Sequence, residues 1–220
     1  MDVAIAGGHG KVALRLARLL ADRGDRVRSL VRTTEHFDDV AATGADPVLC
    51  DLEREEARGV AKHVAGADAV VFAAGAGPGS GPERKRTVDL GAAVKLIGAA
   101  ERAGIRRYLM VSSIGAHDPD AGPEAMRPYL QAKAEADAAL LASGLDHTIV
   151  RPGSLQDDPG TGRVKLSTDL GSRGPIPRDD VAAVLVACLD APETIGLTFE
   201  AFAGDQEIEL AVRALARGSS

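Results

Sequence analysis

A tyrosine and a lysine stand four positions apart in the segment "YLQAK", as Tyr129 and Lys133. The segment has helical periodicity, and residues at i and i+4 share one face of a helix. A phenol with a pKa near 10 must lose about three units to transfer protons at neutral pH, which costs about 4 kcal/mol. An ammonium roughly 6 Å away supplies about 3 kcal/mol at an effective dielectric constant of about 20. The pair therefore predicts a proton donor with its activating cation; the alternative is a half-buried tyrosine beside a solvated lysine.

Two serines follow the apolar residues of "RRYLMVSS", which we predict to be a strand ending at Ser112 and Ser113. In α/β proteins, the carboxyl ends of parallel strands form the edge at which sites assemble. We expect Ser113 to lie there and to donate a hydrogen bond to a substrate carbonyl. The sequence does not determine which of the two serines faces the site, and serines at strand ends are also common without such a role.

Glycines separate an apolar strand from an amphipathic helix in "AIAGGHGKVALRLARLL". Gly8, Gly10 and Ala13 fit the spacing G-x-G-x-x-A, and Gly7, Gly10 and Ala13 fit G-x-x-G-x-x-A equally well. Unpaired N–H groups at a helix N-terminus favour a phosphate, which missing side chains allow to approach. The segment predicts a dinucleotide site, with a purely structural turn as the alternative. A Walker A loop is excluded because Val12 stands where Ser or Thr is required.

The second predicted strand ends in "RSLVRTTE", with Arg32 at the position where NAD-specific sites usually have Asp or Glu. A guanidinium can bind a 2′-phosphate through two hydrogen bonds. Charge-assisted bonds of this kind contribute about 1.5–3 kcal/mol, or roughly 10–100-fold in affinity. We therefore expect NADP(H) as the cofactor in preference to NAD(H); the alternative is an exposed arginine at a strand end.

The composition narrows the class of protein. The 220 residues carry a net charge of −6, contain no tryptophan and are 3% aromatic, which argues against nucleic-acid or anionic-membrane partners. Cys50 and Cys188 are far apart and predict neither a zinc site nor a disulfide framework. We see no signal peptide or membrane span and expect a cytoplasmic protein with a small-molecule substrate, either a monomer or a homodimer.

Short apolar runs alternate with amphipathic segments along the chain. We predict strands over 2–6, 26–31, 47–50, 68–74, 106–113 and 147–152, and helices over 10–24, 53–66, 87–104 and 123–144, with a weaker helix over 33–44. After a loop at 152–162, we predict a strand over 162–166, a helix over 177–192 and a strand over 196–202. The alternation predicts an α/β fold with a doubly wound, mainly parallel sheet. We expect one domain over 1–220, with residues 151–220 shaping the substrate mouth.

These segments together resemble the short-chain dehydrogenase/reductase superfamily. The similarity is greatest to its atypical branch, which includes NmrA-like NADP-binding proteins and the flavin/biliverdin reductases. It is carried by "GGHGKVA", "LVR", "CDLE", "VVFAAGAG", "LIGAAERAGIRRYLMVSS", "YLQAK", "SGLDHTIVRPG" and "RDDVAAVL", in this order. The resemblance implies a Rossmann fold and favours the register of Gly7, Gly10 and Ala13.

The resemblance also implies roles for individual residues. Ser113 would be the catalytic serine, Tyr129 the acid/base and Lys133 the ribose-binding lysine. Arg151 would lie near the nicotinamide, together with two of the cofactor-binding residues, Pro152 and Gly153. The full set of implied cofactor-binding residues is Gly7, Gly8, His9, Gly10, Lys11, Val12, Arg32, Asp51, Leu52, Ala74, Gly75, Lys133, Pro152 and Gly153.

The sequence departs from the superfamily in several places. It contains no asparagine, so the asparagine of the usual proton relay is absent, and Asp89 holds the matching helix position of the extended branch. "FAAGAG" replaces the usual Asn-Asn-Ala-Gly run. The C-terminal part is also short for a sugar-nucleotide epimerase. We assign "ERKR" at 83–86 to a helix start. None of His36, His63, His117 and His147 is at metal-ligand spacing, so we predict no metal site.

The interpretation that best fits the sequence is an NADPH-dependent oxidoreductase that reduces a small carbonyl or conjugated acceptor. Three alternatives stay open: an NADP(H)-binding redox sensor of NmrA-like type with little turnover, a flavin or quinone reductase, and a small NAD(P)-dependent epimerase. The sequence does not name the substrate.

Overall fold

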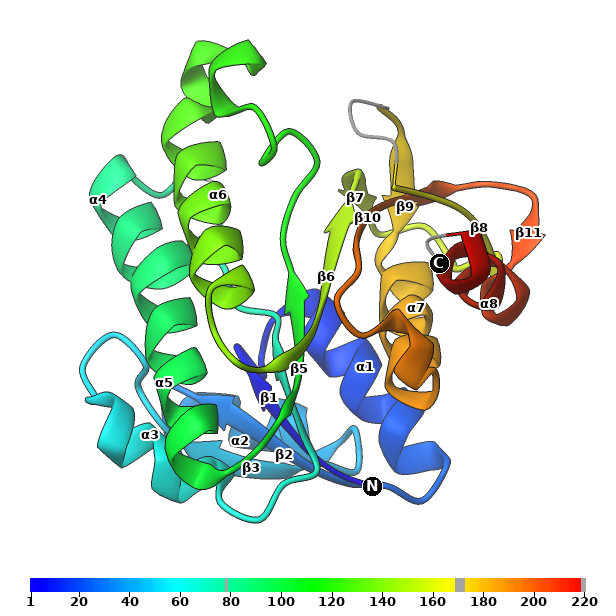
Figure 1. Ribbon diagram of the computed structural model, residues 1–220. Coiled ribbons are helices and arrows are strands. Elements are labelled where there is room, and N and C mark those ends of the chain that lie inside the picture. Colours follow the sequence, from blue (N-terminus) through cyan, green and yellow to red (C-terminus); the bar gives the residue numbers. More distant parts are fainter. Residues whose placement is uncertain (78, 169–172, 219–220) are drawn as a thin grey trace.

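A computed structural model describes residues 1–77, 79–168 and 173–218 (Figure 1). Within these residues, nine strands form one sheet in the order β11-β8-β10-β6-β5-β4-β1-β2-β3. Strands β3 to β10 along this order are parallel, and β8 is antiparallel to its neighbours β10 and β11. The strands are β1 (Asp2–Ala6), β2 (Arg26–Val31), β3 (Asp46–Leu49), β4 (Ala69–Phe72), β5 (Arg107–Val111), β6 (Asp146–Pro152), β8 (Arg163–Ser167), β10 (Thr198–Ala203) and β11 (Gln206–Glu207).

Helices cover both faces of the sheet (Figure 1). One face packs against α1 (Lys11–Asp22), α2 (Phe37–Ala41), α7 (Arg178–Asp190) and α8 (Ile208–Gly218). The other packs against α3 (Ala57–Val64), α5 (Ala93–Ala103) and α6 (Arg127–Leu141). Neighbouring strand residues point to opposite faces, so Val3 and Ile5 of β1 join the first core and Ala4 and Ala6 the second. The doubly wound, mainly parallel α/β fold predicted from the sequence is confirmed.

Several segments differ from the sequence-based expectation. The helix predicted over 87–104 begins earlier, with α4 (Pro82–Arg84), continues as a π-helix over Lys85–Ala92 and only then becomes α5. The expected loop at 152–162 contains strand β7 (Ser154–Gln156), which pairs in parallel with β9 (Pro175–Pro177). Strand β5 ends at Val111, before the two serines. Short 3₁₀ helices occur at Thr34–His36, Pro119–Ala121, Glu124–Met126 and Pro192–Thr194.

The strand order reverses between β1 and β4, since β2 and β3 lie on one side of β1 and β5 and β6 lie on the far side of β4. In open α/β sheets, ligands bind in the crevice outside the carboxyl ends of the strands at such a switch point. Among the described residues, no helix combines the length and the apolar character needed to cross a bilayer.

Candidate functional site

At two positions of the glycine turn after β1, only glycine fits. Gly7 has φ +79°, and a Cβ there would lie 2.5 Å from Cα of Ala74. A Cβ on Gly8 would lie 2.6 Å from Cβ of Ser29 in β2. Both glycines are therefore needed, Gly7 for its backbone conformation and Gly8 for its close packing.

Helix α1 begins immediately after this turn and is open at its N-terminus. Gly10 occupies the N-cap and no side chain caps the helix there. Ala13 is fully buried, which lets α1 pack closely on the sheet. The uncapped N–H groups and the glycine cradle suit an oxyanion of a dinucleotide pyrophosphate. The residues present therefore fit the cofactor class that the sequence predicts.

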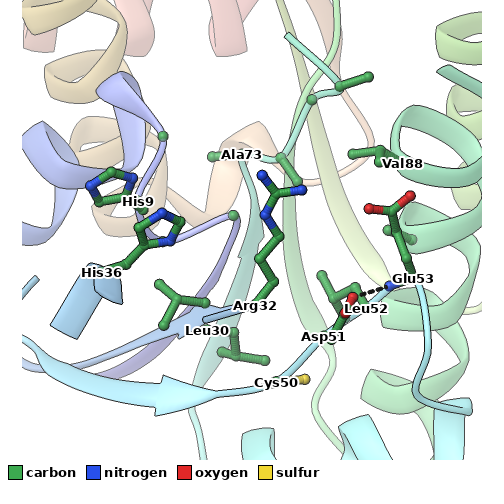
Figure 2. A pocket seen from close by; sticks show the side chains of 18 of the residues that line it. His9, Leu30, Arg32, His36, Cys50, Asp51, Leu52, Glu53, Ala73 and Val88 are labelled. Carbon is green, nitrogen blue, oxygen red and sulfur yellow. Dashed lines mark hydrogen bonds between the residues drawn. The ribbon is translucent and has the colours of Figure 1, made fainter. Parts of the chain in front are cut away.

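A cleft of about 280 Å³ lies beside the glycine turn, between the ends of β2 and β4, and we call it the β2 cleft (Figure 2). The Arg32 side chain extends into it, is exposed, and has no hydrogen bond or ion pair within the described part of the chain. Asp51 is fixed at the floor, where its Oδ1 accepts a hydrogen bond of 3.0 Å from the backbone N–H of Glu53. Of the residues predicted to bind cofactor, those in its wall are Gly7, Gly8, His9, Gly10, Arg32, Asp51, Leu52, Ala74 and Gly75.

A larger pocket of about 1110 Å³ opens between α6 and the segment after β6, and we call it the α6 chamber. It shares residues 73–76, which follow β4, with the β2 cleft. The two pockets therefore lie next to each other in the depression along the carboxyl edge of the sheet. The predicted residues in its wall are Lys11, Val12, Ala74, Gly75, Ser113, Tyr129, Lys133 and Gly153. Pro152 is buried and lines neither pocket.

Tyr129 and Lys133 lie on α6 and both face the α6 chamber. The Nζ of Lys133 is 5.8 Å from the centre of the Tyr129 ring. It is also 3.3 Å from Oδ1 of Asp89, with side-chain exposures of 4% and 1% for the two residues. The same ammonium donates to the carbonyls of Val111 at 3.2 Å and Ala74 at 3.4 Å. Two hydrogen bonds to carbonyls and one buried ion pair thus fix Lys133 in place.

The structure distinguishes between the two serines that follow β5. Ser112 is buried and donates a hydrogen bond of 2.9 Å to Oδ2 of Asp137, which also pairs with Arg151 at 3.0 Å. Burial raises the pKa of Asp137, although the nearby Arg151 guanidinium acts in the opposite direction. Ser113 is half-buried and donates only to the neighbouring carbonyl of Ile114, at 3.1 Å. Both serines line the α6 chamber and Ser113 is the more exposed of the two, whereas Arg151 is engaged below the surface and lines neither pocket.

Four further basic residues in the chamber wall were not among the sequence-based candidates: Lys85, His117, Arg173 and Arg178. Lys85 lies on the π-helix with its Nζ 5.2 Å from the centre of the Tyr129 ring. His117 lies near the buried Glu200, with Nδ1 to Oε1 at 3.8 Å. Arg178 is the first residue of α7. The "ERKR" run contained a signal for Lys85, but its assignment to a helix start concealed that this residue faces Tyr129.

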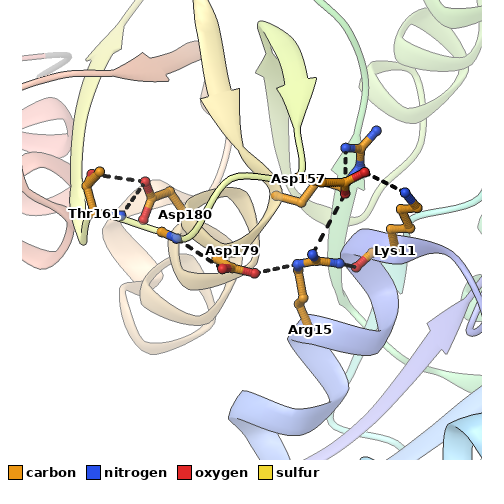
Figure 3. Close-up of polar contacts among 8 residues, drawn as sticks. Lys11, Arg15, Asp157, Thr161, Asp179 and Asp180 are labelled. Carbon is orange, nitrogen blue, oxygen red and sulfur yellow. Dashed lines mark hydrogen bonds and ion pairs between the residues drawn. The ribbon is translucent and has the colours of Figure 1, made fainter.

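Charged residues connect the chamber wall to the glycine turn (Figure 3). Asp157 accepts hydrogen bonds from Nζ of Lys11 at 2.5 Å and from Arg178 at 2.9 Å, and Arg15 of α1 pairs with Asp179 of α7. The buried Asp180 accepts from the backbone N–H of Gly162 at 2.9 Å. Exposed pairs contribute little individually, but a buried carboxylate that accepts backbone N–H groups fixes the path of the chain. Residues 157–162 are thereby held beside the start of α1.

Comparisons with known proteins agree with this geometry. Residues 7–192 match the model of a family described as NAD(P)H-binding. An uncharacterized sugar epimerase of Bacillus subtilis (strain 168) is 43% identical over 98% of this chain and 100% of its own length. A putative NAD-dependent epimerase/dehydratase of Bacillus halodurans is 42% identical, covers 98% of this chain and 100% of its own, and superposes with a TM-score of 0.93. The anaerobillin reductase ChuY of Escherichia coli O157:H7 is 26% identical, with a TM-score of 0.78 and coverage of 94% and 98%.

The fold, the glycine cradle and these similarities agree on the class of protein. A sheet with its switch point beside an uncapped helix N-terminus is the arrangement that binds a dinucleotide. The chain belongs to the NAD(P)H-binding family, within the atypical branch of the short-chain dehydrogenase/reductase superfamily.

Proposed function

We propose that this protein is an NADPH-dependent reductase that acts on a carbonyl or conjugated acceptor bound in the α6 chamber. The observation that carries the proposal is that the two pockets adjoin at residues 73–76, which line both. Arg32 lies in one pocket, and Tyr129, Lys133 and Ser113 lie in the other. When bound along this depression, the dinucleotide would supply hydride to the acceptor carbon.

The chain's own residues account for the proton that accompanies reduction. Ser113 is placed to hydrogen-bond the acceptor oxygen, and Tyr129 to donate the proton that this oxygen gains as its double bond is reduced. Lys133 is held below the Tyr129 ring by Asp89 and two carbonyls. It acts on Tyr129 through its charge, and Asp89 partly offsets that effect. Lys85 adds a second ammonium beside the same ring.

The charges of the chamber favour an anionic acceptor. Among the lining residues in the described part of the chain, five are cationic and two are acidic: Lys11, Lys85, Lys133, Arg173 and Arg178 against Asp89 and Asp118. The whole chain carries a net charge of −6, so the positive excess is local. Such a field raises the local concentration of anionic ligands. The acceptor we propose carries a carboxylate or phosphate on a partly apolar body.

Two other candidate functions have specific support. The buried pairing of Lys133 with Asp89 weakens the activation of Tyr129, which favours a flavin or quinone acceptor that needs less proton assistance. The printed names of two similar bacterial proteins favour an epimerase. An epimerase returns the hydride to its substrate and consumes no NADPH overall, so net cofactor oxidation distinguishes it from a reductase.

The test is a fluorescence titration with NADPH and NADH, followed by acceptors supplied in matched anionic and neutral forms: carbonyl compounds, flavins and quinones. The proposal predicts tighter NADPH binding and oxidation of NADPH with an anionic carbonyl or conjugated acceptor. Binding without oxidation by any acceptor would favour the redox-sensor alternative. Equal oxidation of both cofactors would remove the NADPH preference, and failure to bind either would overturn the proposal.

A further inference from the structure

Two histidines are stacked at the outer end of the β2 cleft. The rings of His9 and His36 are parallel within 5°, with centres 3.7 Å apart. His9 belongs to the glycine turn, and His36 ends the 3₁₀ helix that follows β2. Both line the β2 cleft together with Arg32, as Figure 2 shows. Three basic side chains from three short segments therefore line the same cleft.

The surroundings of His36 disfavour its charged form. Partial burial, His9 and Arg32 lower its pKa below the usual value of 6.5, while Glu35 on the same 3₁₀ helix and Asp39 on α2 act in the opposite direction. Its Nδ1 is buried and has no hydrogen-bond partner among the residues described. His9 differs, since its Nε2 is 2.7 Å from Oδ2 of Asp39. These surroundings therefore favour the uncharged form of His36, and one of its ring nitrogens is buried without a hydrogen-bond partner among the residues described.

A phosphomonoester would change this balance. Such a group carries nearly two negative charges at pH 7, because its second pKa is about 6. Placed beside Arg32, it attracts a charged His36 more strongly than His9 and Arg32 repel it, and its oxygens accept hydrogen bonds from the imidazolium. A cofactor with a 2′-hydroxyl in that place offers no comparable charge.

We propose that His9 and His36 form a proton-linked subsite for the 2′-phosphate of NADP(H), in which His36 takes up a proton as the phosphate binds beside Arg32. The inference rests on the cofactor preference proposed above and adds to it a dependence on pH. A ligand that binds the protonated form more tightly loses affinity as pH rises, and NADPH affinity should fall between pH 6.5 and 8. NADH affinity should stay constant over the same range.

The experiment measures the Kd of NADPH and NADH at several pH values between 6.5 and 8.5. Isothermal titration calorimetry in buffers of different ionisation enthalpy counts the protons taken up. We expect the Kd of NADPH to rise about three- to tenfold across this range, with net proton uptake near pH 7. Repeating the titration with 2′,5′-ADP and 5′-AMP, which differ only in the 2′-phosphate, assigns the effect to this phosphate without involving the nicotinamide or turnover.

The variant His36→Gln should remove the pH dependence and weaken NADPH binding severalfold, with an unchanged Tm as evidence of folding. His63→Gln is the matched control, since this histidine pairs with Glu55 and lines neither pocket. Preferred NADPH binding with the same pH dependence in the wild type and in His36→Gln would overturn the subsite and leave the cofactor preference standing. Equal affinity for 2′,5′-ADP and 5′-AMP would overturn both the subsite and the cofactor preference. Neither result depends on whether an acceptor is reduced.

Discussion

The β2 cleft and the α6 chamber differ in which parts of the chain build them. The lining of the β2 cleft, about 280 Å³, runs only from Gly7 to Ala92. The lining of the α6 chamber, about 1110 Å³, runs from Lys11 to Arg178 and includes segments after β5, after β6 and at the start of α7. The proposed cofactor end is thus assembled from local turns in the first half of the fold, whereas the proposed substrate end is assembled by the packing of segments distant in sequence. Loops of the chamber can therefore diverge without disturbing the β2 cleft.

Among single substitutions, Gly7→Ala is expected to disrupt the glycine turn beside the β2 cleft most strongly. A left-handed backbone costs about 1–2 kcal/mol for a residue with a side chain. The new Cβ would also collide with the backbone of Ala74. We expect nucleotide binding to weaken by about 100-fold or more and Tm to fall by about 2–8 °C. NADPH titration and thermal unfolding check this.

Gly98→Ala is the control for that variant, because the nearest atom to its Cβ is the Cβ of Ala57 at 3.6 Å, an ordinary contact. It should bind NADPH as the wild type does. Wild-type NADPH affinity in Gly7→Ala would show that the turn does not approach the cofactor.

Tyr129→Phe tests the substrate end alone. Without the phenol, kcat for a carbonyl acceptor should fall by at least about 100-fold, while the Kd of NADPH stays unchanged. Steady-state kinetics and a binding titration measure the two effects separately. A retained rate with carbonyl acceptors would remove Tyr129 from the mechanism, and a retained rate only with flavins or quinones would select that alternative.

Arg32→Ser perturbs the cofactor end in a ligand-specific way. Loss of charge-assisted bonds to a 2′-phosphate should raise the Kd of NADPH by about 10–100-fold and leave that of NADH unchanged. Arg58→Ser on α3 is the control, since this exposed arginine lines neither pocket. An equal loss of affinity for NADPH and NADH would mean that Arg32 contacts the adenosine instead of the 2′-phosphate.

The smallest effect is expected from Lys85→Gln in the chamber. Removing this ammonium should lower kcat/KM for an anionic acceptor by about 5–10-fold and change that for its neutral ester by less. The exposed Lys62 lines neither pocket and provides the control Lys62→Gln. High ionic strength should reproduce part of the loss in the wild type. An equal loss of kcat/KM for both acceptors would mean that Lys85 acts on Tyr129 and not on the charge of the substrate.

The regular elements were accessible from the sequence because each depends on neighbours within a few residues. The alternation of Val3 and Ile5 with Ala4 and Ala6 predicts a strand buried on both faces, and the structure has it. The spacing of Tyr129 and Lys133 correctly predicts one helix face. The parallel pairing of Ser154–Gln156 with Pro175–Pro177 was missed, because short strands in a segment rich in Pro and Gly carry no periodic signal.

Local spacing thus determined the sheet and its helices, the glycine turn, Arg32 at the end of β2, and the shared face of Tyr129 and Lys133. Tertiary structure alone decided which partners these groups meet: Asp89 for Lys133, Asp137 for Ser112 and His36 for His9. It also brought Lys85 and Arg178 to the same chamber. The physical reason is the sequence distance over which each property is set. Periodicity within one element encodes only which of its faces is buried. The charge and hydrogen-bond environment of a side chain depends on distant segments that only packing brings together.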